Sequence, residues 1–346
     1  MQPCDSLSFP SALVFMAPTT TFVIRSAPRP GSTDKPPVRV SVASNEGSTV
    51  SDLKNAFFKS INKPHFDVNR YRFTVETSGE HLAPNERALS AFPSISKDAS
   101  EITIVYKDLG PQISWRTVFI VEYLFPMLVF PLLWVLVRKF PQSAFTKFLY
   151  GEADPVYTRQ SVRDWQDMLA VMFTAHFFKR EIETMLIHRF GNDTMPLRNI
   201  FKNSGYYWAF AFWIAFVTMH PLYSPPSCQS ARTIGPILFV VSELLNLKAH
   251  IDLRNLRPAG TRIRQVPRGL LFKFISCPNY LFEILAWVGF TMAGQSVAAA
   301  SFMVVGAAQM TVWAIQKHKR YRKEFNGEDG REQYPRNRRI LLPFIF

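Results

Sequence analysis

Two patterns of apolar and polar positions divide the chain near residue 110. Upstream, Thr21–Arg25 and Val38–Val42 alternate between apolar and polar side chains, which is the period of a strand with one buried face. Shorter runs at 70–75 and 101–106 show the same period. These four segments predict a β-sheet in the N-terminal part of the chain.

One helix is predicted between the second and third of these strands. Thr49 is followed three residues later by Asp52, a capping box with Asp in place of the usual Glu, and apolar side chains then recur at helical spacing over 53–61. A hairpin, a helix and further strands, in that order, indicate an α+β ubiquitin-like domain over residues 18–109. Another small α+β module remains the alternative. Residues 1–17 lack this patterning and are expected to be a disordered leader.

Downstream, the apolar runs approach the length of about twenty residues that crosses a bilayer as a helix. Six such segments are expected, at 117–137, 169–190, 205–223, 234–247, 281–295 and 297–315. The second is the weakest because it carries several charged side chains, and a further buried segment near 270–276 would make seven. The chain is therefore predicted to be a multispan α-helical membrane protein with six to seven transmembrane helices, in which residues 110–165 hold the first span and a connector.

Composition supports this class of protein. The 346 residues are 47% hydrophobic and carry a formal net charge of +14, which fits basic loops at an anionic membrane surface. The basic residues are spread through short loops rather than gathered on one soluble face, so a nucleic-acid partner is not expected. The three cysteines show neither a disulfide framework nor the spacing of a metal site, and no metal is expected.

Loop charge predicts the orientation. The loop 221–231 contains no Lys or Arg, whereas the loop 254–273 and the C-terminal tail are strongly basic. Because basic loops stay in the cytosol, six spans would place both termini there. The loop 138–165 is also basic yet would lie on the opposite side, which contradicts the rule locally.

Polar residues lie at the mouth of the predicted span 281–295. Asn279, Tyr280 and Glu283 adjoin an apolar run, and the arginine-rich loop 254–273 precedes them. Ionisable groups within a membrane are costly and therefore mark functional sites by default. A tyrosine that can give a proton, beside a dense cationic loop, suggests a redox enzyme that holds a phosphorylated cofactor.

A polar stripe runs along the predicted segment 169–190. His176, Lys179, Arg180 and Glu183 have the i, i+3, i+4, i+7 spacing of one helix face. We interpret this face as the wall of a polar cavity because the charges lie in mid-segment. The alternative is that these side chains pair with one another or reach the membrane interface.

Two further groups recur at nearly helical spacing. Asn246, His250, Arg254 and Arg257 begin inside an apolar span and emerge into the basic loop, where Asn can bind a carboxamide and Arg a phosphate. In the tail, Lys317 and Tyr321 continue a row that starts with Gln309 and Trp313. The alternatives are that the two arginines mark the cytosolic end of a helix, and that the tail row is an interfacial girdle.

No G-x-G-x-x-G motif follows a strand, and the sequence shows no P-loop, HExxH motif or nucleophile elbow. A dinucleotide would therefore have to be held by helices and arginines inside the bundle.

Several segments together resemble the C-terminal reductase domain of the steroid 5α-reductase family, and within it the trans-2-enoyl-CoA reductase branch. The segments are 176–183 (HFFKREIE), 194–203 (TMPLRNIFKN), 220–226 (HPLYSPP), 253–260 (LRNLRPAG), 276–280 (SCPNY) and 342–346 (LPFIF). The resemblance covers roughly residue 19 to the end and implies that residues 166–346 are the catalytic membrane domain. Reductases of this branch also carry a ubiquitin-like N-terminal domain.

Two departures separate the branches of the family. Steroid-reducing members have an Asn-x-x-x-Asp pattern where this chain has Asn246 and His250, and they have Gly where it has Phe282. Both departures favour the enoyl-CoA branch.

The resemblance also implies roles for individual residues. Tyr280 matches the family's catalytic tyrosine, as proton donor or oxyanion partner, and Lys179 matches its essential lysine, with an electrostatic role. Which of the two moves the proton is left open. From the polar stripe, and not from the resemblance, His176 and Glu183 are assigned to the substrate cavity. The residues assigned to the NADPH site are Asn246, His250, Arg254, Arg257, Asn279, Glu283, Lys317 and Tyr321.

The implied reaction is the NADPH-dependent saturation of the trans-2 double bond of a very-long-chain acyl-CoA. It is the last step of very-long-chain fatty-acid elongation, at the cytosolic face of the endoplasmic reticulum membrane. The expected partners are the 2-enoyl-CoA substrate, membrane lipid and the other elongation enzymes, namely ketoacyl-CoA synthase, ketoacyl-CoA reductase and hydroxyacyl-CoA dehydratase. The alternatives are reduction of a steroid or polyprenol enone, or a non-catalytic scaffold that docks elongation enzymes through its N-terminal domain.

Overall fold

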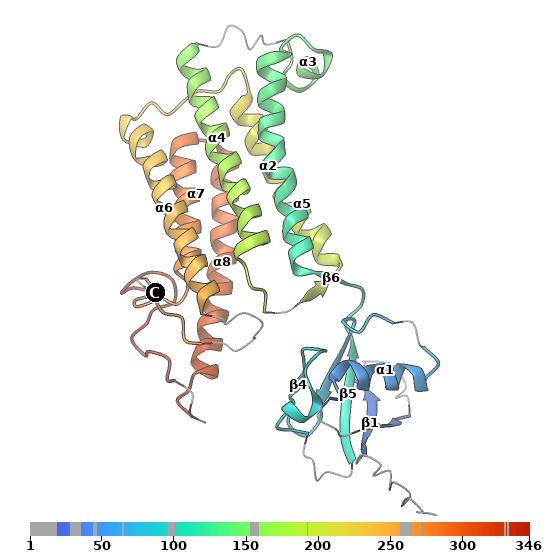
Figure 1. The fold of residues 1–346 in the computed structure, drawn as a ribbon. Coiled ribbons are helices and arrows are strands. Elements are labelled where there is room, and N and C mark those ends of the chain that lie inside the picture. The colour runs from blue at the N-terminus through green and yellow to red at the C-terminus, as the bar shows by residue number, and fades with distance from the viewer. Residues whose placement is uncertain are drawn as a thin grey trace, which may run out of the picture. The chain divides into compact units, whose positions relative to one another are not determined.

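The structure is a computed structural model and divides into two units, Met1–Gln112 and Ile113–Phe346, which are described separately (Figure 1). The described residues are 19–27, 36–43, 47–63, 66–95, 101–152, 159–191, 193–256, 265–269, 271–328, 330 and 332–346. The predicted leader and Arg257 lie outside them.

The N-terminal unit is built on a five-stranded sheet with the order β2-β1-β5-β3-β4. Its strands are β1 (Thr19–Ser26), β2 (Val38–Ala43), β3 (Tyr71–Val75), β4 (His81–Leu82) and β5 (Glu101–Asp108). The central strands β1 and β5 are parallel, with Phe22 opposite Ile102, and the other neighbours are antiparallel. Parallel neighbours need a crossover, and α1 (Val50–Ser60) and the short η1 (Leu89–Ala91) lie within it.

Helix α1 covers the sheet with its apolar face. The predicted capping box is confirmed, since Asp52 N donates to Thr49 Oγ1 at 3.3 Å and Thr49 N donates to Asp52 Oδ2 at 2.8 Å. Leu53 and Phe57 are buried against Phe22 and Ile104 of the strands. This unit therefore has a hydrophobic core of its own.

Lys54 is buried beside that core. Its ammonium donates to Val68 O at 2.8 Å and to Asn85 Oδ1 at 2.7 Å. Because burial removes the charged amine from water, the pKa of Lys54 falls to about 8. The folded unit consequently holds this proton more weakly than the unfolded chain does.

The C-terminal unit is a bundle of six long helices among the described residues. They are α2 (Trp115–Lys139), α4 (Gln160–Ile182), α5 (Arg198–Met219), α6 (Gln229–Asn255), α7 (Pro278–Gly294) and α8 (Val297–Glu324). Shorter elements are α3 (Ala144–Tyr150), the π-helical turn η3 (Glu183–Ile187), and β6 (Gln112–Ser114) with β7 (Thr194–Pro196), which pair as a two-stranded sheet. Each of the six predicted apolar segments overlaps one long helix, but the segment 169–190 was placed too far along the chain, because α4 already ends at Ile182.

Three of the described helices, α2, α6 and α8, are long and apolar enough to cross a membrane. On α2, Leu124, Leu128 and Leu132 lie on one exposed face, 43%, 44% and 63% accessible, which suits contact with lipid. Helix α7, with 17 residues, is shorter than the length required of a span, and α4 carries too many charged side chains to count as an apolar span. The chain is therefore a helical membrane protein, and a count of six or seven spans stays a prediction.

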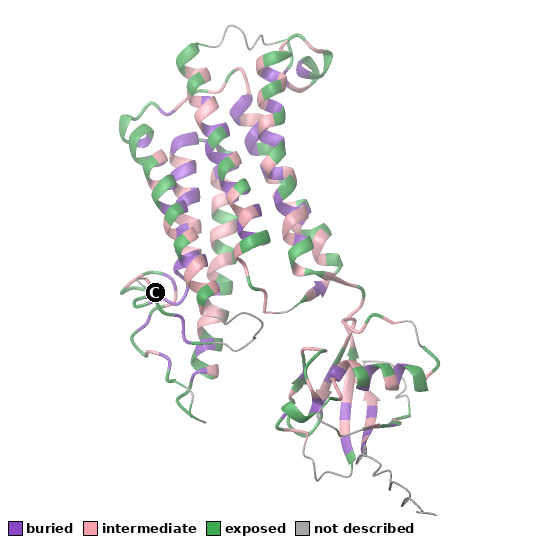
Figure 2. Ribbon diagram, viewed as in Figure 1, coloured by how far each residue is buried: buried purple, intermediate pink, exposed green. Residues whose placement is uncertain are grey.

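Helices α6 and α7 approach each other closely at two glycines, Gly235 and Gly289. A Cβ on Gly289 would lie 2.6 Å from Phe239 N, and one on Gly235 would lie 2.8 Å from Ala293 N. Small residues let helix backbones pack this tightly in membranes. Buried residues cover much of α7, whereas the outer face of α6 exposes Ile237, Val240 and other apolar side chains (Figure 2). The close contact fixes the side chains that α6 and α7 present to the interior.

Candidate active site

Three helices bring polar side chains together inside the bundle. Helix α4 contributes His176 and Lys179, which are one turn apart, and α6 contributes Glu243 and Asn246 with the same spacing. Helix α7 contributes Glu283. We call these five residues the polar ring.

Each residue of the polar ring contacts two other members, so that the contacts form a closed circuit. His176 Nδ1 donates to Glu243 Oε1 at 2.7 Å, and Lys179 Nζ lies 2.7 Å from Glu243 Oε2. Lys179 donates to Asn246 Oδ1 at 2.6 Å, and Asn246 Nδ2 donates to Glu283 Oε2 at 3.1 Å. Glu283 Oε1 lies 3.4 Å from His176 Nε2 and completes the circuit. The ring thus ties α4, α6 and α7 together.

A second group of contacts extends the ring toward α2. Glu183 Oε2 accepts from Arg180 Nη1 at 2.7 Å, and Glu183 Oε1 lies 3.5 Å from Lys179 Nζ and 3.0 Å from His250 Nδ1. Arg180 Nη2 also donates to the hydroxyl of Tyr123, on α2, at 3.1 Å. Buried charges require such partners, because a single unpaired ion in this environment would be strongly destabilising.

Access to the ring is uneven. The side chains of His176 and Glu183 are 3% and 0% exposed, whereas those of Lys179 and Glu283 are each 16% exposed. Lys179 and Glu283 are therefore the least buried side chains of the polar ring. An accessible cation with a fixed position suits stabilisation of a developing negative charge.

Tyr280 lies in a different group. Lys317 Nζ is 5.5 Å from the centre of the Tyr280 ring and 5.9 Å from that of Tyr321, and Tyr280 also packs against Trp313. These contacts join α7 to α8. Tyr280 and Glu283 are three residues apart on α7, so the aromatic group adjoins the polar ring without sharing a contact among those described.

The structure places the remaining predicted cofactor residues as follows. Asn279 is buried, its carbonyl accepts from Asn246 Nδ2 at 2.8 Å, and its Oδ1 has no hydrogen-bond partner among the described residues. His250 is 8% exposed and faces Glu183, while Arg254 is partly buried at the end of α6. Asn279 Oδ1 is therefore a buried acceptor that has no partner in the part of the chain that the structure describes.

Glu183, His188 and His250 also gather potential metal-ligand atoms within 4.8 Å of one another. However, Glu183 is already paired with Arg180 at 2.7 Å and lies 3.5 Å from the ammonium of Lys179. Two cations this close would repel a divalent metal ion. We therefore assign no metal to this cluster.

Two residues of this region were not assigned to the site from the sequence. Glu243 bridges two ring members, and a single acid inside an apolar span three residues before Asn246 was the signal that could have identified it. Tyr123 contacts Arg180 from α2, but an aromatic residue in an apolar helix gives no such signal.

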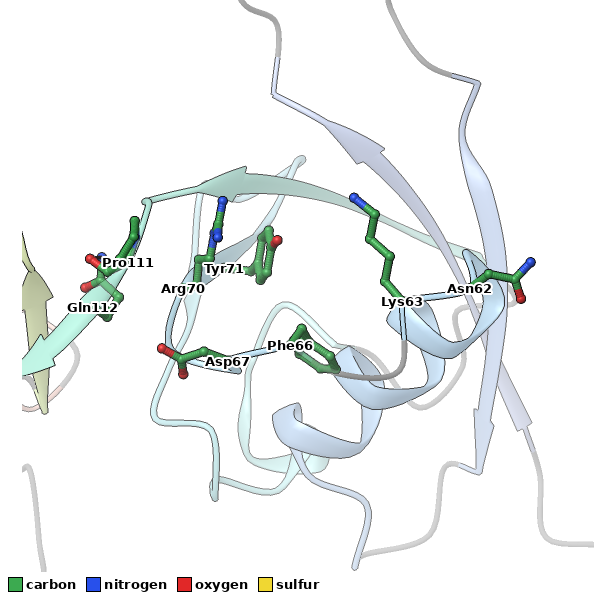
Figure 3. Close-up of a pocket in the computed structure, with 8 residues that line it drawn as sticks. All are labelled: Asn62, Lys63, Phe66, Asp67, Arg70, Tyr71, Pro111 and Gln112. Carbon is green, nitrogen blue, oxygen red and sulfur yellow. Dashed lines mark hydrogen bonds between the residues drawn. The ribbon is translucent and has the colours of Figure 1, made fainter.

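The N-terminal unit has an open pocket of about 560 Å³ (Figure 3). It is lined by Asn62, Lys63, Phe66, Asp67, Arg70, Tyr71, Pro111 and Gln112. Arg70 makes a two-pronged contact with Asp108, with both N···O distances at 2.8 Å. Because this guanidinium is already paired, we place the chemistry in the polar ring of the other unit and not in this pocket.

Comparison with known proteins gives the family. The model of the family described as 3-oxo-5-alpha-steroid 4-dehydrogenase matches residues 193–346. The very-long-chain enoyl-CoA reductase of Dictyostelium discoideum is 38% identical over 313 residues, which are 88% of this chain and 94% of that protein. The Caenorhabditis elegans protein named "Probable very-long-chain enoyl-CoA reductase art-1" is 37% identical over 87% of this chain and 93% of its own length. A bovine protein named trans-2,3-enoyl-CoA reductase-like is 28% identical over 86% of this chain and 77% of its own length. The chain belongs to the very-long-chain enoyl-CoA reductase family.

Proposed function

We propose that this chain reduces the trans-2 double bond of a very-long-chain enoyl-CoA with NADPH, the closing step of the fatty-acid elongation cycle. The observation that carries the proposal is the polar ring, in which Lys179 is held by neighbours on α6 and its side chain is 16% exposed. The names of the full-length relatives supply the substrate class.

The chemistry requires control of one negative charge and one proton. When bound, NADPH supplies a hydride to the β-carbon of the enoyl thioester. Negative charge then develops on the thioester oxygen, and an accessible ammonium such as Lys179 stabilises it electrostatically. A proton must reach the α-carbon, and Tyr280 and Lys179 both carry protons that can be donated.

Residues of this chain fit a nicotinamide cofactor. The unpartnered Asn279 Oδ1 can accept a hydrogen bond from the carboxamide, beside Asn246 and Glu283 of the ring. Lys317 and Tyr321 would hold the cofactor from α8, and His250, Arg254 and Arg257 from α6 and the basic loop. Guanidinium groups suit the phosphate of NADPH because they bind it through two parallel hydrogen bonds.

The N-terminal unit has the strand order and the single main helix of a ubiquitin-like grasp, which supports the assignment of that fold. We infer that it binds other elongation enzymes, because no residue assigned to the chemistry lies in it. The same proposal places six spans in the endoplasmic reticulum membrane, with both termini in the cytosol.

Reduction of a steroid or polyprenol enone is the second candidate, because a steroid dehydrogenase model matches residues 193–346. The two activities are separated by offering the purified protein NADPH with either a 2-enoyl-CoA or a 4-ene-3-ketone. The proposal expects turnover of the thioester, and preference for the ketone would reject it.

A further inference from the structure

Glu243 connects the two basic members of the polar ring. One carboxylate oxygen accepts from His176 Nδ1 at 2.7 Å, and the other lies 2.7 Å from Lys179 Nζ. Because each oxygen has a different partner, rotation of the carboxylate would break both contacts. The Glu243 side chain is only 11% exposed, so water cannot readily replace either partner.

Lys179 needs such a neighbour to have a defined position. Its ammonium ends a flexible four-carbon stem, so the position of the charge depends on the acceptors around it. Two groups one helical turn apart on α6 lie close to Nζ: Glu243 Oε2 forms an ion pair with it at 2.7 Å, and Asn246 Oδ1 accepts its hydrogen bond at 2.6 Å. Glu183, at 3.5 Å, is the competing carboxylate on the same helix as Lys179.

We propose that Glu243 is a positioning residue for the reduction: it holds the Lys179 ammonium on the α6 side of the ring and away from Glu183. The inference rests on the proposed function, because it assigns Glu243 an effect through Lys179 on the same reaction. Without the Glu243 carboxylate, Lys179 would be drawn toward Glu183, and its charge would no longer lie where the thioester oxygen binds.

The effect expected on turnover is large because catalysis depends on accurate placement. A displacement of about 1 Å can cost on the order of 10²-fold in rate. Glu243→Leu, which removes both acceptor oxygens, should therefore lower kcat by roughly 10²-fold. Glu243→Gln keeps one acceptor oxygen and should lose less, about tenfold, with partial recovery relative to the leucine variant.

A double-mutant cycle distinguishes positioning from a general structural defect. If Glu243 acts through Lys179, Glu243→Leu should cost almost nothing further in a Lys179→Met background. Single-turnover rates of the four proteins, measured with NADPH and a 2-enoyl-CoA, give this comparison. Additive losses in the double variant would overturn the inference.

Glu181 offers a matched control on the same helix as Lys179. It is also a buried glutamate, 4% exposed, and its carboxylate has no hydrogen-bond partner among the described residues. Glu181→Leu should keep kcat within about threefold of wild type, because it does not contact the ring. Should Glu243→Leu fail to fold, the same cycle is run with Glu243→Gln.

Different results would refute the proposed function and the role of Glu243. Wild-type protein that binds NADPH but does not reduce 2-enoyl-CoA would refute the proposed function. Active wild-type protein whose Glu243→Leu and Glu243→Gln variants both keep kcat within about threefold would refute only the role of Glu243.

Discussion

The contact between α6 and α7 predicts that a single methyl group at Gly289 disturbs both stability and activity. A Cβ there would lie 2.6 Å from Phe239 N and 2.7 Å from Gly235 O, both of which are backbone atoms that cannot rotate away. Ordinary van der Waals contact begins at 3.4 Å, so the helices would have to separate locally by about 0.8 Å.

The size of the effect follows from two opposing terms. Overpacking a tight interior costs about 1–3 kcal/mol. Replacing glycine by alanine inside a helix gains about 0.5–1 kcal/mol. Gly289→Ala should therefore lose on the order of 1–2 kcal/mol of stability.

Separation of α6 from α7 would also stretch the contacts of Asn246 with Glu283 and Asn279, now 3.1 Å and 2.8 Å. Turnover should fall by roughly tenfold or more.

Gly306→Ala is the matched control for this prediction. A Cβ on Gly306, in α8, would meet Tyr206 OH at 3.6 Å and Met310 Cε at 3.8 Å, which are ordinary contacts. Thermal unfolding and NADPH oxidation would be measured for both variants in the same detergent. Equal melting temperatures and equal turnover for Gly289→Ala and Gly306→Ala would refute the proposed close packing.

Four further predictions concern single groups or whole segments. Tyr280→Phe should lower turnover by at least about 10²-fold with little change in NADPH binding, and near-wild-type turnover would mean that another residue supplies the proton. Arg257→Ala should raise the KM for NADPH more than that for the acyl-CoA, and an unchanged NADPH KM would place Arg257 outside the cofactor site. Deletion of residues 1–109 should leave the isolated reduction measurable while weakening malonyl-CoA-driven elongation in microsomes; a folded, inserted but inactive protein would show that this unit helps to build the active site. In a fragment of residues 19–112, the free energy of unfolding should rise between pH 8 and pH 10.5 by at most about 3 kcal/mol. The reason is that, in this pH range, the unfolded chain still binds the Lys54 proton that the folded unit has lost. Lys54→Met should remove the rise.

Periodicity explains why most elements could be predicted from the sequence. The capping box at Thr49 and the polar stripe through His176 and Lys179 each lie within one helix, so spacing alone places their members on one face. Each of the six predicted apolar segments overlaps a long helix for the same reason. Only α2, α6 and α8 of the described helices also have the length and hydropathy expected of a span. Helix α4 does not, because part of its surface carries charged side chains.

Contacts between helices could not be predicted in the same way. Glu243 is an isolated acid in α6, and its partners His176 and Lys179 lie more than sixty residues away on α4. Asn279 and Tyr280 are adjacent in sequence, but successive helical residues point about 100° apart. The backbone carbonyl of Asn279 accepts from Asn246 of the polar ring, whereas the Tyr280 ring faces Lys317 on α8.

The most direct test of the central claim is NADPH oxidation by the purified wild-type chain with a very-long-chain trans-2-enoyl-CoA, with the saturated product quantified. We predict one saturated acyl-CoA per NADPH consumed and little turnover of a 4-ene-3-ketosteroid, and we expect Lys179→Met to lower turnover by at least about 10²-fold. Saturation of the ketosteroid in preference to the thioester, or full activity in Lys179→Met, would contradict it.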